Sequence, residues 1–170
     1  MSIAGVLRLD CATVARIEAL TNALPDRRVE PRRNRPYIVL ASYSQSVDVG
    51  DLDACLATAT NRWNRLTITL TDILVHPGNP AMLGLLVAPV TDLLHHHASI
   101  QRALTDLPTH PSFEIGTWVP HVMLGRTTLL ADAIEVLASI WTGAVIGSAV
   151  SLDLVQLDPP QTLSSRPLLG

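Results

Sequence analysis

The sequence predicts a mixed α/β domain, and three observations indicate this class. Apolar runs of strand length alternate along the chain with stretches whose apolar residues recur at helical spacing. Hydrophobic residues make up 48% of the 170 residues and charged residues 16%, so the chain can bury a sizeable core. Two segments also echo each other, PYIVLAS at 36–42 and PHVMLGR at 120–126. We therefore expect one domain with an internal repeat over residues 1–158, followed by a C-terminal tail at 159–170.

The first elements follow in the order strand, helix, strand. The apolar run at 3–9 is a strand candidate, and Asp10 is placed to cap a helix that Pro25 ends. A loop rich in arginine and proline then leads to a second, β-branched strand at 36–43.

The middle of the chain predicts a helix and a hairpin. Asp48 is placed to cap a helix that runs to about residue 63. Leucine and isoleucine then alternate with threonine over 66–71, which is the pattern of a half-buried strand. The segment HPGNP at 76–80 has turn chemistry, and the returning strand follows at 82–87.

The last third repeats the alternation of helix and strand. Pro89 favours the start of a third helix. A strand at 118–124 and a helix at 127–141 follow, and Gly143 closes that helix. The apolar run at 145–157 supplies a last strand or strand pair.

The charge distribution argues against a protein that coats nucleic acid. The net charge is −3 and the pI about 6.0, whereas nucleic-acid-binding domains are usually strongly basic. Five arginines are nevertheless concentrated in one short loop: Arg27, Arg28, Arg32, Arg33 and Arg35. This loop directly precedes the strand at 36–43, so it is either an anion-steering lid or a solvated connector.

The cysteines and the apolar segments indicate the cellular compartment in which we expect the protein. With only Cys11 and Cys55 and no recognisable secretory signal, the sequence predicts reduced thiols, packed as small core residues, in a cytoplasmic protein. The apolar stretch at 138–152 is shorter than the roughly 20 residues that a membrane span needs. We therefore expect no membrane segment.

The two echoing segments resemble the motifs of a known family. PHVMLGR is similar to the second signature of the two-histidine (2H) phosphoesterases, which include the 2′-5′ RNA ligase-like proteins, and PYIVLAS stands where the first signature is expected. The resemblance covers roughly residues 3–157. It implies two similar lobes around a central cleft, with antiparallel sheets inside and helices outside.

The resemblance also implies a mechanism. Each lobe of that family contributes a histidine and, two positions later on the same strand, a threonine or serine, so that both side chains face the cleft. One imidazole takes a proton from the attacking hydroxyl and the other gives a proton to the leaving oxygen. The hydroxyls hold the phosphate oxygens.

This sequence departs from the family pattern at three of the four motif positions. The first motif reads Tyr37-Ile38-Val39 and the second reads His121-Val122-Met123. Valine and methionine side chains cannot hold a phosphate oxygen by hydrogen bonding. A tyrosine, with a reference pKa near 10, is a poor base at neutral pH. Proton exchange between two motif imidazoles is therefore not available to this chain.

The motif strands still contain candidate site residues. His121 is the leading catalytic candidate, with a leftover histidine lining an inactive cleft as the alternative. Tyr37 is a substitute acid or a ring that stacks on a ligand, with an aromatic plug as the alternative. Tyr43 lies six positions after Tyr37, and this separation predicts the same strand face and a ligand-binding role.

Three further residues are candidates for ligand binding. Arg35 precedes the first motif and Arg126 follows the second, so we expect both to offer cations to a phosphate or carboxylate at the cleft mouth. Met123 occupies a hydroxyl position of the family pattern and would make the cleft more apolar.

The sequence predicts no metal and no cofactor. The tract His95-His96-His97 resembles a metal site, but successive helical residues lie about 100° apart and do not converge on one ion. We expect these to be helix-surface histidines. Zinc-ligand spacing, a glycine-rich phosphate loop and a serine nucleophile elbow are all missing from the sequence.

Three functions remain open. The first is a divergent family member that lacks cyclic phosphodiesterase activity and binds a nucleotide or another anionic small molecule in the cleft. The second is an active phosphoesterase that uses His121 with Tyr37 or with water. The third is an enzyme of different chemistry with an apolar substrate, which Val39 and Met123 favour a little. Because one fold hosts many functions, the resemblance alone does not decide among them.

Overall fold

The computed structural model describes residues 2–24, 30–31, 35–44, 47–107 and 109–170. Its eight strands form one sheet in which each pair that shares a ladder is antiparallel. The strands are β1 (Ser2–Leu9), β2 (Glu30–Pro31), β3 (Tyr37–Ser44), β4 (Leu66–His76), β5 (Ala81–Val87), β6 (His121–Thr127), β7 (Val145–Leu157) and β8 (Pro160–Pro167).

The strand order closes on itself. The path runs β1-β3-β6-β5-β4-β7-β8, and β1 also pairs with β7, so that β1 lies between β3 and β7. The long strand β7 pairs with β4 through its first residues and with both β1 and β8 through its later ones. It therefore runs through both halves of the sheet.

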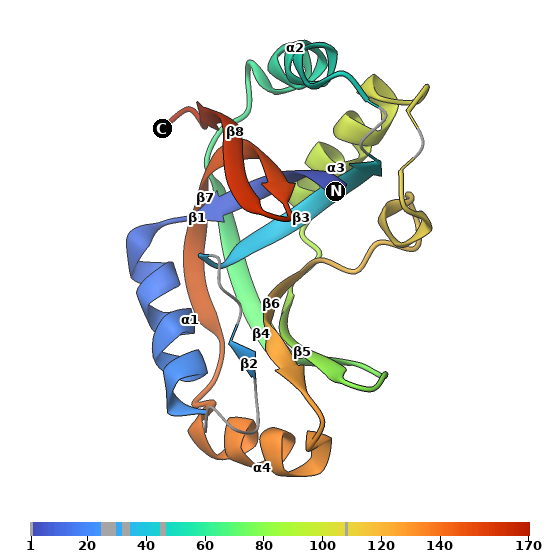
Figure 1. Cartoon of the computed structure of the whole chain (residues 1–170). Helices are drawn as coiled ribbons and strands as arrows, with labels where there is room; N and C mark the ends of the chain where they lie inside the picture. The colour runs from blue at the N-terminus through green and yellow to red at the C-terminus, as the bar shows by residue number, and fades with distance from the viewer. Residues whose placement is uncertain (1, 25–29, 32–34, 45–46, 108) are drawn as a thin grey trace.

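The helices divide into two pairs at opposite ends of the molecule (Figure 1). Helices α2 (Val49–Thr60) and α3 (Thr91–Ala103) contact each other, and α3 packs on β3. Helices α1 (Cys11–Ala23) and α4 (Leu130–Ile140) likewise contact each other, and α1 packs on β6 and β7. The arrangement is the two-lobed α/β fold with outer helices that the sequence predicts. Among the described helices, none is long and apolar enough to cross a membrane.

The predicted caps explain where two helices begin. The Asp10 carboxylate accepts hydrogen bonds from the backbone N–H and the hydroxyl of Thr13, at 2.8 Å and 2.6 Å, and so caps α1. It also accepts from the Ser148 backbone N–H at 2.6 Å, which ties the helix start to β7. Burial tends to raise the pKa of Asp10, but these hydrogen bonds outweigh it and hold the pKa below its usual value. Asp48 caps α2 in the same way through the Asp51 N–H.

Two apolar clusters form the core. The larger cluster joins the helices to one face of the sheet and includes Ile38, Leu40 and Val122. The smaller one lies on the other face of β1, β3 and β7 and consists of Ala4, Val6, Tyr37 and Val155. The motif strand β3 thus contributes to both clusters, as a strand with two buried faces does.

The C-terminal residues differ from the predicted tail. Instead of a surface extension at 159–170, residues 160–167 form β8, which pairs with β7 along its whole length. Leu168 is buried, with 5% of its surface exposed. The prolines that suggest a tail occupy the turn and the two ends of the strand, where a missing N–H donor does little harm.

The predicted face of Tyr43 is wrong. Val39 pairs with Val6 whereas Ala41 pairs with Gly5, so Leu40 is an extra residue, a β-bulge, in β3. A bulge shifts the alternation by one, and Tyr43 consequently packs in the larger cluster while Tyr37 packs in the smaller one. Because of the bulge, a separation of six residues puts the rings of Tyr37 and Tyr43 on opposite faces of the sheet.

Two simpler expectations are also wrong. Cys11 and Cys55 are exposed free thiols rather than core residues. Of the histidine tract, only His95 is exposed. His96 stacks on Trp63 with ring centroids 3.9 Å apart, and His97 is buried against Trp118 at 4.1 Å.

Candidate functional site

The two motifs meet at the centre of the sheet. The middle residue of the first motif, Ile38, pairs with the middle residue of the second, Val122, and this is the pairing that joins β3 to β6. In an antiparallel register, this pair sets Tyr37 opposite Met123 and Val39 opposite His121. The pairing of β3 with β6 thus brings the two motif strands side by side, although they are far apart in the sequence.

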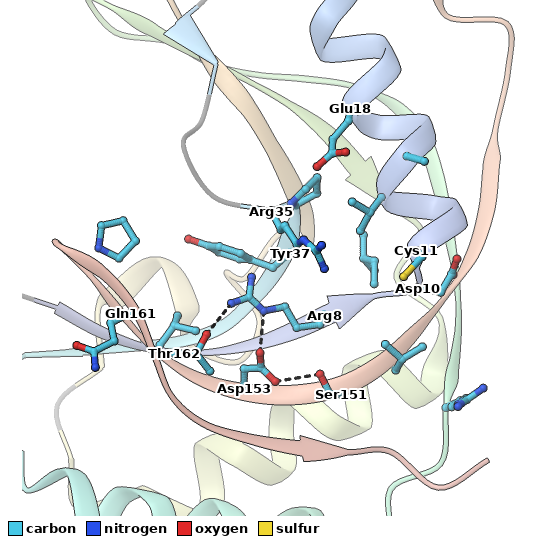
Figure 2. Close-up of a pocket in the computed structure, with 18 of the residues that line it drawn as sticks. Arg8, Asp10, Cys11, Glu18, Arg35, Tyr37, Ser151, Asp153, Gln161 and Thr162 are labelled. Atoms are coloured by element: carbon cyan, nitrogen blue, oxygen red, sulfur yellow. Dashed lines mark hydrogen bonds and ion pairs between the residues drawn. The ribbon is translucent and has the colours of Figure 1, made fainter.

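A cavity of about 840 Å³ opens beside the first motif. Its walls come from the end of β1, the N-terminal half of α1, the start of β3, the middle of β7 and the start of β8. Figure 2 shows Tyr37 and Arg35 on one side, Cys11 and the α1 helix on another, and Gln161 from β8 at the far end. Segments that are far apart in the sequence thus build one concave site.

An ion pair forms the floor of this cavity. Arg8 Nε donates to Asp153 Oδ2 at 2.8 Å, and the Asp153 carboxylate also accepts from the hydroxyls of Ser151 and Ser165, at 2.9 Å and 2.6 Å. A second guanidinium nitrogen of Arg8 lies 3.3 Å from the Thr162 hydroxyl. The Asp153 side chain is 8% exposed, so this charge is buried but fully hydrogen-bonded.

Tyr37 packs against the same network. It is 2% exposed, and the Arg8 guanidinium carbon lies 5.3 Å from the centre of its ring, within the range of a cation–π contact. The residue at the motif histidine position therefore supplies an aromatic wall beside a fixed cation.

The charges left for a ligand are mainly those of arginines. Three arginines and three acids line the cavity, but Arg8 and Asp153 neutralise each other and Asp10 caps α1. Arg35, Arg65 and Glu18 remain, and neither arginine side chain makes a hydrogen bond or ion pair with another described residue. The start of α1 also faces the cavity, where the Asp10 carboxylate already satisfies the helix dipole.

His121 occupies a separate environment. It is half-buried at the start of β6 and is not among the residues that line the cavity. Its Nδ1 lies 2.8 Å from the Val119 carbonyl oxygen, and its ring centroid lies 5.1 Å from that of His76. The structure therefore brings the strands of Tyr37 and His121 together but places only Tyr37 in the cavity.

The remaining predicted site residues lie at different distances from the cavity. Arg35 lines it. Tyr43 is buried in the larger core cluster, where burial raises the pKa of its phenol. Met123 is half-buried on β6, and Arg126 is exposed where β6 pairs with β2. The other arginines of the loop, Arg27, Arg28, Arg32 and Arg33, fall outside the described residues.

Sequence reasoning missed the network on the cavity floor. Arg8 and Asp153 each interrupt an apolar strand, in GVLRL and SLDLV. A charged residue inside a buried strand is the available signal, because charges are rarely buried unless they are paired. Which charge pairs with which depends on the β1–β7 pairing, and the local sequence does not specify it.

Within the described residues, no three histidine, cysteine, aspartate or glutamate side chains cluster closely enough to hold a metal ion. The polar side chains that line the cavity include arginine, tyrosine, hydroxyl and amide groups together with the Cys11 thiol and the Glu18 carboxylate. Its arginine, hydroxyl and amide groups are of the kind that bind anions and polar ligands.

Comparison with solved structures identifies the fold. No protein-family model matches the chain, and no curated protein matches its sequence. TT0787 of Thermus thermophilus superposes with a TM-score of 0.74 at 14% identity, covering 100% of this chain and 99% of that one. A structure described as a phosphoesterase gives 0.70 at 14% identity and covers 99% of both chains.

Escherichia coli LigT in complex with 3′-AMP gives a TM-score of 0.67 at 12% identity, with 99% of this chain and 98% of that one covered. The chain therefore has the 2H phosphoesterase fold over its whole length, as the motif resemblance predicts.

Proposed function

We propose that this protein is a divergent 2H phosphoesterase-like protein that binds a nucleotide or another anionic small molecule in the cavity beside Tyr37. We further propose that it lacks the cyclic phosphodiesterase activity that two motif histidines support. The observation that carries the proposal is the cavity of about 840 Å³ next to a motif strand whose histidine is replaced by tyrosine.

The composition of the cavity supports an anionic ligand. Arg35 and Arg65 are the cations that the internal ion pair leaves available. Escherichia coli LigT has been crystallised with phosphate, with 3′-AMP, with ATP and with NADP+, and this makes such ligands the first to test.

The motif residues argue against proton exchange across a phosphate. An imidazole at the first motif would have to act as acid or base, and a phenol is a weak substitute at neutral pH. The side chains of Val39 and Met123 have no N–H or O–H group that can donate a hydrogen bond to a phosphate oxygen. We also propose the cytoplasm as the compartment, because exposed free thiols such as Cys11 and Cys55 persist where the surroundings are reducing.

The binding proposal is tested by calorimetry with 3′-AMP, ATP and NADP+. We expect at least one to bind and Arg35→Ala to weaken that binding tenfold or more, since a charge-assisted hydrogen bond contributes about 1.5–3 kcal/mol. Arg62→Ala is the matched control, because Arg62 is exposed outside the cavity and should leave the affinity unchanged. If none of these ligands or inorganic phosphate binds, the proposed binding function is wrong.

The association rate tests whether the arginines outside the described residues, Arg27, Arg28, Arg32 and Arg33, steer an anionic ligand. If their loop steers an anion, Arg27→Ala and Arg28→Ala should lower the association rate and its salt dependence while leaving the affinity nearly unchanged. Equal association rates for these variants and the parent at low salt would identify the loop as a solvated connector.

The proposed loss of activity has its own test. We expect no turnover of a 2′,3′-cyclic nucleotide above that of the buffer, because removal of one acid–base partner alone costs roughly 10²- to 10⁴-fold in rate. Robust hydrolysis that disappears in His121→Ala would instead support the active phosphoesterase that uses His121 with Tyr37.

A further inference from the structure

The cavity beside Tyr37 is elongated along β7. Arg8 pairs with Tyr37 on one side and with Ser151 on the other, whereas Gln156 pairs with Gln161 at the turn into β8. These residues all line the cavity. Since a strand rises about 3.3 Å per residue, the stretch from Ser151 to Gln156 is about 17 Å long. The cavity therefore has two ends, which differ in their side chains.

The charged side chains belong to the Ser151 end. Arg65 precedes Leu66, whose partner on β7 is Ala149, and Arg35 lies two residues before the strand partner of Arg8. Figure 2 shows Asp10 at this end, Gln161 at the other and Arg8 between them. Beyond Asp153, the described residues that line the cavity from β7 and β8 are all uncharged: Val155, Gln156, Pro160, Gln161 and Thr162.

The charges at the first end balance one another. Three arginines and three carboxylates line the cavity among the described residues, so the lining carries no net charge. A ligand with several phosphates would bring like charges together without enough cations to compensate them. A single phosphate group, in contrast, needs only the N–H groups of one or two arginines.

Arg8 offers such N–H groups in a fixed direction. Its Nε donates to Asp153 at 2.8 Å, and one terminal nitrogen donates to the Thr162 hydroxyl at 3.3 Å. A guanidinium carries further N–H groups on its terminal nitrogens, and no described residue accepts from those of Arg8. The Arg8 side chain is 22% exposed, so these groups are open to the cavity while the ion pair holds the guanidinium in place.

Two amides occupy the uncharged end. Gln156 Nε2 donates to the Pro159 carbonyl oxygen at 3.0 Å, which leaves Oε1 of that amide to accept a hydrogen bond. Gln161 is exposed, and its amide makes no hydrogen bond with another described side chain. A glutamine amide can donate to and accept from the edge of one base, as it does with N6 and N7 of adenine. This end therefore suits an uncharged nucleobase.

We propose that the ligand of this cavity is a nucleoside monophosphate, with its phosphate at Arg8 and Arg35 and its base at Gln156 and Gln161. This inference rests on the function proposed above and narrows it to one class of ligand. The separation of charged from uncharged side chains along β7 carries the inference, because it matches a molecule whose charge is confined to one end.

Calorimetry with the whole chain tests the class of ligand. We expect the tighter-binding of 3′-AMP and 5′-AMP to bind at least tenfold more tightly than adenosine, inorganic phosphate or ATP. Adenosine lacks the phosphate, inorganic phosphate lacks the base, and ATP adds charge that the lining does not compensate.

Substitutions test the two ends separately. Gln161→Leu removes an amide at similar size, so it should weaken binding of that AMP about threefold to tenfold and leave binding of inorganic phosphate unchanged. Arg35→Ala should weaken binding of both ligands tenfold or more. Gln101→Leu, on α3 outside the cavity, is the matched control and should bind AMP as the parent does.

Two results would overturn the inference. One is ATP that binds as tightly as AMP, and the other is a Gln161→Leu variant that keeps the full affinity for AMP. In either case anion binding that Arg35→Ala weakens would still support the proposed function, whereas a failure of every ligand to bind would contradict that function as well. Unfolding curves for each variant distinguish a lost site from a lost fold.

Discussion

The histidine tract shows how little a side chain's neighbours in sequence say about its surroundings. His95 is exposed, His96 stacks on Trp63 and His97 stacks on Trp118, where its Nε2 lies 2.8 Å from the Phe113 carbonyl oxygen. Because successive helical residues point in different directions, each ring meets a different partner. His97 is therefore a buried residue and His96 a partly buried one, and only His95 is a surface group.

Burial of His96 predicts acid sensitivity. Both of its ring nitrogens are buried without a hydrogen-bond partner among the described residues. Burial and the neighbouring His95 lower the pKa of His96 to about 4, against a small opposing effect of Asp92. Between pH 6.5 and pH 4, His96 is therefore protonated in the unfolded chain but remains neutral in the folded protein. The free energy of unfolding consequently falls as the solution is acidified through this range.

We expect urea unfolding to show this loss as a difference between pH 7 and pH 4.5. His96→Phe keeps a ring on Trp63 but does not titrate, and its loss of stability on acidification should be smaller by about 2 kcal/mol, a value that allows for partial exposure. His95→Gln, on the same helix, should lose as much as the parent or slightly less. Equal acid sensitivity of His96→Phe and the parent would contradict the assignment.

At the scale of elements, β8 contributes more than its composition suggests. Ser165 donates to Asp153 on the cavity floor, and the Arg166 guanidinium pairs with Asp53 of α2 at 2.6 Å. Ser164 also hydrogen-bonds the Asp53 carboxylate, and these hydrogen bonds, with Arg166 first, lower the pKa of that group. The last strand thus connects the cavity to a helix on the outside of the same lobe.

Adjacent leucines at the end of β8 test its contribution. Leu168 is 5% exposed and Leu169 is 53% exposed. Leu168→Ala should lower the free energy of unfolding by about 2–3 kcal/mol, because it leaves a buried space that the structure fills only in part. Leu169→Ala should change it by no more than about 0.5 kcal/mol. Similar small effects in both variants would show that the segment is the dispensable tail that its prolines suggest.

Local signals predicted most elements. Asp10 and Asp48 cap helices because their carboxylates accept N–H groups within three residues, and such contacts are visible in the sequence. The bulge at Leu40 is not visible there, since it depends on how β3 aligns with β1. The motif residues are local in the sequence, and they pointed to Tyr37 and Arg35 on one wall of the cavity. The contribution of Arg8, Asp153 and the start of β8 depends on how the strands pair, and this is not visible in the local sequence.

At the scale of the molecule, two connections join the lobes. β3 pairs with β6, and β7 passes from β4 in one lobe to β1 and β8 in the other. Neither lobe can lose its sheet without exposing strand edges and apolar residues of the other. A two-lobed outline therefore does not imply two folding units.

This connectivity predicts that the two lobes unfold together. The prediction is tested by destabilising one lobe with a substitution and following the unfolding of the other lobe by its tryptophan fluorescence. Leu137 is fully buried on α4, so Leu137→Ala should destabilise its own lobe by about 2–5 kcal/mol. In a Trp141→Phe background, the remaining fluorescence comes from Trp63 and Trp118, which pack against α3 in the opposite lobe. We expect Leu137→Ala to lower the urea midpoint of this fluorescence as much as that of the far-ultraviolet circular dichroism, because α4 packs on α1, which in turn packs on β6 and β7. An unchanged fluorescence midpoint with an earlier, partial loss of circular dichroism would show instead that the α1–α4 lobe opens alone.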